Sequence, residues 1–164
     1  MENNKFIISA LVSNQFGVLT RVAGLFARRG YNIESLAVGP IENSKYSRMT
    51  ILVYGDDYVK EQISKQLLKL YDVKKVKILE LDNSLVREHV LVKIKIKDGK
   101  NILINNLVNK YSGRIVDFSE ESISVELTED IIANEKFIEE AKEFGILEMC
   151  RAGALALNYG KEIL

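Results

Sequence analysis

The chain has 164 residues, of which 47% are hydrophobic, so it is long enough to bury one core or two small ones. Lysine plus arginine and aspartate plus glutamate number 23 each, and this zero net charge argues against a nucleic-acid-binding protein, which needs a basic excess. A single cysteine, Cys150, excludes an internal disulfide and fits a reducing compartment. Because no signal peptide and no membrane-spanning run is indicated, we expect a cytoplasmic protein without membrane contact.

The first half of the chain predicts the order strand, helix, strand, strand, helix, strand. Apolar residues on both faces of 5–13 indicate an interior strand or one that packs on a partner sheet. Helical spacing follows over 17–29, and Gly30 ends that helix as a left-handed glycine would. Gly24 lies inside the helix, where a close backbone approach would explain it. The remaining predicted elements are strands near 31–38 and 47–54, a helix striped by Val59, Ile63, Leu67 and Leu70, and a strand near 73–81.

The same pattern starts again after residues 82–84, which is an internal structural repeat. Alternation of apolar and mostly charged residues over 90–97 predicts a strand with one solvent-exposed face. A helix over 103–111 ends at Gly113, as the left-handed Gly30 ends the first helix, and a later helix that carries Phe137 ends at Gly145. The remaining segments are strands at 115–118, 122–127 and 146–150, and a tail in which 154–157 favours a short helical turn.

These patterns predict an α+β protein with two tandem ferredoxin-like βαββαβ domains, residues 1–82 and 83–164. In each domain, two helices would cover one face of a four-stranded antiparallel sheet.

The turn at 14–17, between the first strand and the first helix, is the strongest candidate for a ligand site. Free backbone N–H groups and the helix dipole favour an anion there, and Gly17 has no side chain to keep a ligand away. Asn14 offers both a donor and an acceptor to a small zwitterion. A capped turn without a ligand would use the same residues, so the turn alone leaves both interpretations open. The matching segment of the second domain, Lys97-Asp98-Gly99-Lys100, lacks an equivalent of Asn14, and we expect a weak site or none there.

Other chemistry-bearing residues favour structural roles. His89 has no carboxylate or nucleophile paired with it by spacing, so it is interpreted as structural or solvated. Cys150 is expected to be a small buried hydrophobe. The strip Lys93, Lys95 and Lys97 is either a solvated sheet face or a subunit contact.

Two further classes of function receive little support from the sequence. No paired carboxylates, metal-ligand spacing or nucleophile–base arrangement indicates an enzyme, so we expect no catalytic residues and no metal site on this chain. An RNA-recognition module of the same topology would need exposed aromatics on its central strands, and residues 48–53 lack that pattern.

The tandem βαββαβ pair with a small-molecule turn after its first strand resembles a pair of ACT domains, which sense amino acids. The strings at 14–22, 24–26, 29–36 and 47–51 resemble one family closely, the small regulatory subunit of acetolactate synthase, also called acetohydroxyacid synthase. The resemblance extends to 91–94 and to the closing Arg151-Ala152-Gly153.

This resemblance implies a regulatory subunit without an active site of its own. It would bind the catalytic subunit, raise its activity and confer feedback inhibition by valine in branched-chain amino acid biosynthesis. Thiamine diphosphate, magnesium and FAD would belong to the catalytic partner. The resemblance also implies a homodimer whose first domains pair side by side and bind valine at their interface. A stand-alone ACT-type amino-acid sensor that controls another enzyme is the alternative.

The resemblance also implies the residues of the valine site. Asn14, Gly17, Val18 and Leu19 would lie along the effector's carboxylate and amino group, and Asn32 and Ile33 of the partner subunit would close the site. Phe16 is bulkier than the small polar residues usual in the family, so it could narrow the pocket or shift the effector preference. The candidate contacts with the catalytic subunit are Arg28, Arg29 and Arg48.

Overall fold

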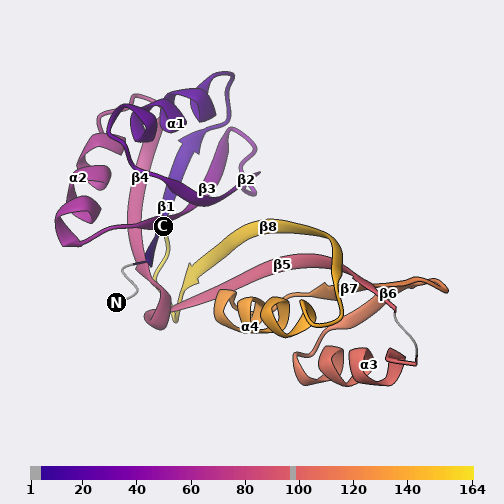
Figure 1. Ribbon diagram of the computed structural model, residues 1–164. Coiled ribbons are helices and arrows are strands. Elements are labelled where there is room, and N and C mark those ends of the chain that lie inside the picture. The colour runs from indigo at the N-terminus through magenta and orange to yellow at the C-terminus, as the bar shows by residue number, and fades with distance from the viewer. Residues whose placement is uncertain (1–4, 97–98) are drawn as a thin grey trace. The chain divides into compact units, whose positions relative to one another are not determined.

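The computed structural model describes residues 5–96 and 99–164, which form two compact units (Figure 1). The first unit combines Met1–Val86 with Ala154–Leu164, and the second is Arg87–Gly153. The contacts therefore group Ala154–Leu164 with the first unit, whereas the second domain predicted from the sequence spans residues 83–164.

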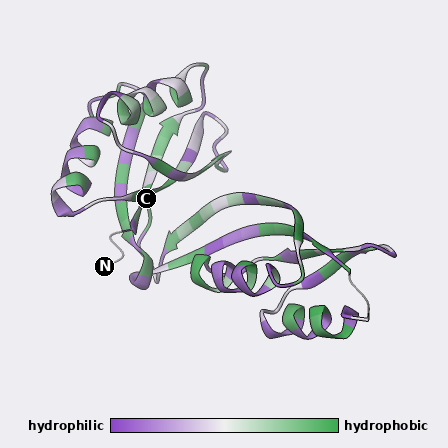
Figure 2. Cartoon of the chain, viewed as in Figure 1, coloured by the Kyte–Doolittle hydropathy of each residue, from purple (hydrophilic) through white to green (hydrophobic). Residues whose placement is uncertain are grey.

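The first unit has the predicted βαββαβ order. Its elements are β1 (Lys5–Ser13), α1 (Val18–Arg28), β2 (Ile33–Pro40), β3 (Tyr46–Tyr54), α2 (Asp57–Leu67) and β4 (Val73–Glu80). The strands form an antiparallel sheet in the order β2-β3-β1-β4, and α1 and α2 lie on one face of it (Figure 1). The helices carry hydrophobic and hydrophilic residues in alternation along their length, as amphipathic helices do (Figure 2). The core between sheet and helices includes Phe6, Ile8, Ala10, Val22, Phe26, Ile51, Val53, Ile63 and Leu67.

Strand β1 is buried on its second face as well, which explains its two apolar faces. Ile7 and Ser9 alternate with the core residues and are fully buried. Arg48 pairs with Leu11 across the sheet and donates to the carbonyl oxygen of Ala156 at 2.8 Å, so the C-terminal segment lies against this second face.

The second unit repeats the order of elements. They are β5 (Ser84–Lys95), which follows the short helix η1 (Leu81–Asn83), α3 (Asn101–Lys110), β6 (Arg114–Phe118), β7 (Ser122–Leu127), α4 (Ile131–Ala141) and β8 (Ile146–Asn158). The sheet order is β6-β7-β5-β8. Buried and exposed residues alternate along β5, as the sequence predicted. The α+β fold class and the repeated βαββαβ topology are therefore confirmed.

Three local predictions were wrong. The tail does not turn into a helix at 154–157, because β8 continues to Asn158 and its buried residues Ala154 and Ala156 alternate as in a strand. Gly113 is not left-handed; Ser112 takes that conformation, with φ of 53°, and a Cβ on Gly113 would crowd the side chains of Val108 and Val125. The backbone does not approach Gly24 closely, since the nearest atom to an added Cβ there is in the Arg28 side chain, at 3.4 Å.

Candidate functional site

The turn between β1 and α1 is held from two sides. The backbone N–H of Ser13 donates to the carbonyl oxygen of Asp72 at 2.8 Å, just before β4 begins. The N–H of Asn14 donates to the carbonyl oxygen of Lys45 at 2.8 Å, just before β3 begins. Both bonds are between backbone atoms, so the path of the turn depends little on the side chains that it carries.

The N-terminus of α1 has no side-chain cap. Gly17 is its N-cap residue, with φ of 78°, and the first turn contains no acidic residue. Within residues 5–96 and 99–164, the N–H groups of Gly17, Leu19 and Thr20 have no hydrogen-bond acceptor. By contrast, Asp56 caps α2 and Asp130 caps α4 through their carboxylates. The unsatisfied donors and positive dipole end of α1 therefore favour an anion.

A cation that the sequence did not predict lies beside these donors. Arg21 donates from Nε to Oδ2 of Asp72 at 2.7 Å, and the Asp72 side chain is only 10% exposed. A Cβ built on Gly17 would lie 2.8 Å from Nη1 of Arg21, so the guanidinium stands over the bare glycine backbone. Arg21 and Asp72 are 51 residues apart, and no local pattern links them.

The side chain of Asn14 is oriented by the β2–β3 loop. Its Nδ2 donates to the carbonyl oxygen of Ser44 at 2.9 Å. Among the described residues no donor reaches its Oδ1, so that oxygen can accept a hydrogen bond from an ammonium group. Asn14, Gln15 and Phe16 line an open hollow, and the Phe16 ring is fully exposed rather than packed into the turn.

The structure brings together four of the six predicted site residues, with different roles. Asn14 and Gly17 present polar atoms at the turn, and Leu19 is 47% exposed on the first turn of α1. The Val18 side chain is 4% exposed and belongs to the core, so only its backbone faces the turn.

Asn32 and Ile33 lie at the opposite end of the first sheet. Ile33 pairs with Val53, which pairs with Phe6, whereas Ser13 at the other end of β1 pairs with Tyr46. The seven positions from Phe6 to Ser13 correspond to about 23 Å along the strand. One chain therefore cannot bring Asn32 and Ile33 to its own β1–α1 turn.

The structure corrects one interpretation outside the turn and adds a partner to another. Cys150 is exposed, not buried, because it lies on β8 at a sheet edge. His89 does have a carboxylate partner: its Nε2 is 2.9 Å from Oε1 of Glu126, across the β5–β7 pairing. Arg114 and then His89 hold the pKa of the Glu126 carboxyl below its usual value. These partners are on different strands, so spacing along the chain could not reveal them.

The basic residues singled out from the sequence differ in exposure. Lys93 lies near Glu148, with 3.7 Å between Nζ and Oε2, whereas Lys97 and Asp98 lie outside the described residues. Arg28 and Arg29 are exposed. The candidate contact at Arg48 is half-buried instead, and burial lowers the pKa of its guanidinium.

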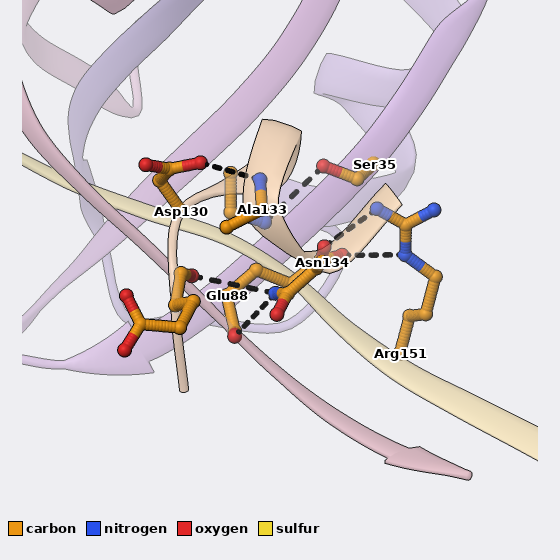
Figure 3. A network of polar contacts seen from close by, with 8 residues as sticks. Ser35, Glu88, Asp130, Ala133, Asn134 and Arg151 are labelled. Carbon is orange, nitrogen blue, oxygen red and sulfur yellow. Dashed lines mark hydrogen bonds and ion pairs between the residues drawn. The ribbon is translucent and has the colours of Figure 1, made fainter. Parts of the chain in front are cut away.

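A polar network connects three elements of the second unit (Figure 3). Arg151 on β8 donates to both carboxylate oxygens of Glu88 on β5, at 2.9 and 2.5 Å, and Glu88 is 3% exposed. The fully buried Asn134 on α4 donates from Nδ2 to the carbonyl oxygen of Glu88 at 3.0 Å. The hydrogen bond to Glu88 raises the pKa of the Arg151 guanidinium.

No helix in residues 5–96 or 99–164 is long and apolar enough to cross a membrane. Over the same residues, His, Cys, Asp and Glu side chains do not gather in groups of three or more that could hold a metal ion.

Comparison with known proteins covers nearly the whole chain. Residues 8–75 match the model of a family described as AHAS small subunit-like ACT domain, and residues 87–160 match one described as small subunit of acetolactate synthase. A probable acetolactate synthase small subunit of Methanothermobacter thermautotrophicus is 45% identical over 100% of this chain and 98% of that protein. The acetolactate synthase small subunit of Mycobacterium leprae is 43% identical over 93% of this chain and 90% of that protein. The crystal structure of the acetolactate synthase small subunit from Thermotoga maritima superposes with a TM-score of 0.87 and 38% identity, over 96% of this chain and 99% of that one.

Proposed function

This chain belongs to the family of acetolactate synthase small subunits, and we propose that it binds and activates an acetolactate synthase catalytic subunit and confers feedback inhibition by valine. The observation that carries the effector proposal is the uncapped N-terminus of α1 beside the Arg21 guanidinium. Thiamine diphosphate, magnesium and FAD would be held by the catalytic subunit, and this chain would contribute regulation alone.

The polar groups of the turn match those of a free amino acid. The carboxylate would accept from the N–H groups of Gly17 and Leu19 and from the unused Nη donors of Arg21. The ammonium group would donate to Oδ1 of Asn14. An isopropyl group would pack on exposed apolar surface such as Leu19. The two methyl-sized groups that separate valine from alanine are worth roughly 1.6 kcal/mol, or about fifteenfold in affinity, so pocket shape must add to the selectivity.

A twofold dimer would complete this site. β2 is an edge strand, and its Pro40 end pairs with Ser47, at the same end of the sheet as Asn14. If β2 pairs antiparallel with its copy, the Ile33 end of each β2 lies beside the Pro40 end of the other. This arrangement carries Asn32 and Ile33 of the partner subunit across the roughly 23 Å that separates them from the turn in one chain.

Calorimetric titration of the purified chain with valine, leucine and isoleucine, followed by assay with the catalytic subunit, tests the proposal. We expect saturable binding of valine by the dimer, activation of the catalytic subunit, and loss of that activity as valine is added. Valine binding without any effect on acetolactate synthase would indicate a stand-alone sensor for another enzyme. Absence of binding would refute the effector site.

A further inference from the structure

Strand β8 belongs to both units. It is a single strand from Ile146 to Asn158, and its first half forms the edge of the second sheet beside β5. The division between the units falls inside it, between Gly153 and Ala154. Gly153 has φ of 82°, a conformation that other residues rarely adopt, so the backbone at this position requires glycine.

The second half of β8 is bound to the strands of the proposed effector unit. The N–H of Ala154 donates to Oγ of Ser35 on β2 at 3.3 Å, and Arg48 on β3 donates to the carbonyl oxygen of Ala156. Farther along, Glu162 pairs with Lys77 on β4 at 2.6 Å. Ser35 is two positions from Ile33, which the proposed function places at the effector site of the partner subunit. A movement of β2 on effector binding would therefore act directly on Ala154.

The first half of β8 is bound by side-chain contacts to the second unit. Arg151, two residues before Gly153, donates two hydrogen bonds to the buried carboxylate of Glu88 on β5 (Figure 3). Asn134 on α4 holds the backbone of the same Glu88. Glu88 lies next to Arg87, the first residue of the second unit, and Arg151 lies two residues before Gly153, the last one. The ion pair therefore connects the two ends of the second unit. Removing Arg151 would leave the buried Glu88 carboxylate without its ionic partner, which is costly.

We propose that β8 transmits effector binding from the first unit to the second, and that Arg151 is the positioning residue that fixes β8 to the second unit for this purpose. This inference rests on the proposed function. It gives the ion pair a regulatory role. Effector binding displaces β2, and the contact between Ser35 and Ala154 passes the displacement of β2 to β8. Arg151 and Glu88 then pass it to β5 and α4.

The test uses the complex reconstituted with the catalytic subunit and compares Arg151→Met, Arg151→Lys and Ser35→Ala with the unmodified protein. For Arg151→Met we expect the valine dissociation constant and the activation of the catalytic subunit to stay within about twofold of the values for the unmodified protein. We expect residual activity at saturating valine to rise about fivefold or more, which is the lower end of the usual range of allosteric coupling. Arg151→Lys should give an intermediate loss, because it keeps one charge beside Glu88. Arg114→Met, which breaks an ion pair with Glu126 on the same sheet but away from β8, is the matched control and should stay inhibited.

The outcomes separate this inference from the proposed function. If the unmodified protein does not bind valine, the proposed function fails and the inference fails with it. If the unmodified protein is inhibited and Arg151→Met is inhibited equally, only the link through β8 is overturned. A weaker valine affinity in Arg151→Met would also overturn it, because the residue would then support the fold of the site. If Arg151→Met does not fold, Ser35→Ala takes its place. Unchanged valine affinity with weaker inhibition would then support the link through β8, and unchanged inhibition would overturn it.

Discussion

Asp72 orients Arg21 across 51 residues of sequence, with 2.7 Å between its carboxylate oxygen and the guanidinium Nε. The carboxylate is nearly buried, whereas the Arg21 side chain is 48% exposed, so one edge of the guanidinium is fixed and the other is free. Together with the bare backbone of Gly17, the free edge forms a carboxylate-sized site at the start of α1. The backbone carbonyl oxygen of Asp72 also accepts a hydrogen bond from the N–H of Ser13, which connects the ion pair to the turn itself.

Arg21→Gln should weaken valine binding about tenfold, which corresponds to roughly 1.4 kcal/mol and to the low end for hydrogen bonds to charged groups. Asp72→Asn should have a smaller effect, because the amide still accepts from Nε but carries no charge. Calorimetric titration with valine measures both. Arg28→Gln, at the far end of the same helix, is the control and should bind as the unmodified protein does. Equal affinities in all variants would show that Arg21 takes no part in binding.

Gly17→Asp should abolish inhibition by valine and retain activation of the catalytic subunit. The new carboxylate would occupy the position of the effector carboxylate, and its Cβ would displace Nη1 of Arg21. Activity of the reconstituted complex against valine concentration measures the effect. Gly99→Asp is the matched control: Gly99 is also left-handed, with φ of 71°, and an added Cβ there has no atom within 4 Å, but the residue belongs to the second unit. Inhibition that survives Gly17→Asp would rule out the proposed site.

Phe137→Ala should destabilise the second unit by about 3–5 kcal/mol, because the side chain is fully buried and contacts Tyr111 edge to face at 5.8 Å between ring centroids. Urea unfolding measures this loss. Ile132→Ala, at an exposed position of the same helix, should change stability by less than about 0.5 kcal/mol. Valine binding by folded Phe137→Ala should be unchanged, since the site lies in the first unit. A loss below about 1 kcal/mol for Phe137→Ala would contradict the packing described.

The ion pair between Glu162 and Lys77 predicts that acid weakens one contact of the C-terminal segment. Lys77 lowers the pKa of Glu162 in the folded chain. The pair is therefore intact above the ordinary glutamate pKa of about 4.3 and is lost as the pH falls through the lowered folded value. Titration of the Glu162 carboxyl by NMR should give a midpoint below that of an unfolded glutamate, and Lys77→Met should bring it back. An ordinary midpoint in the unmodified protein would show that the pair does not persist in solution.

Local patterns predicted most of the secondary structure correctly. Period-two alternation in 90–96, helical spacing over 17–29 and the left-handed glycines Gly30 and Gly145 act within a few residues, so a single segment contains the whole signal. Prediction failed where a distant contact decides the conformation. The tail around Ala154 is a strand because it packs on the first unit, and nothing within the tail encodes that surface.

The sequence by itself determined the repeated βαββαβ order, the exposed N-terminal turn of α1 and the family of this chain. Only the tertiary structure decided that Arg21 stands beside that turn, that Val18 faces the core, and that Asn32 and Ile33 lie at the far end of the sheet. The physical reason is the range of the forces involved: backbone geometry and amphipathic spacing act over one or two helical turns, whereas ion pairs and sheet packing join residues 50 to more than 100 positions apart.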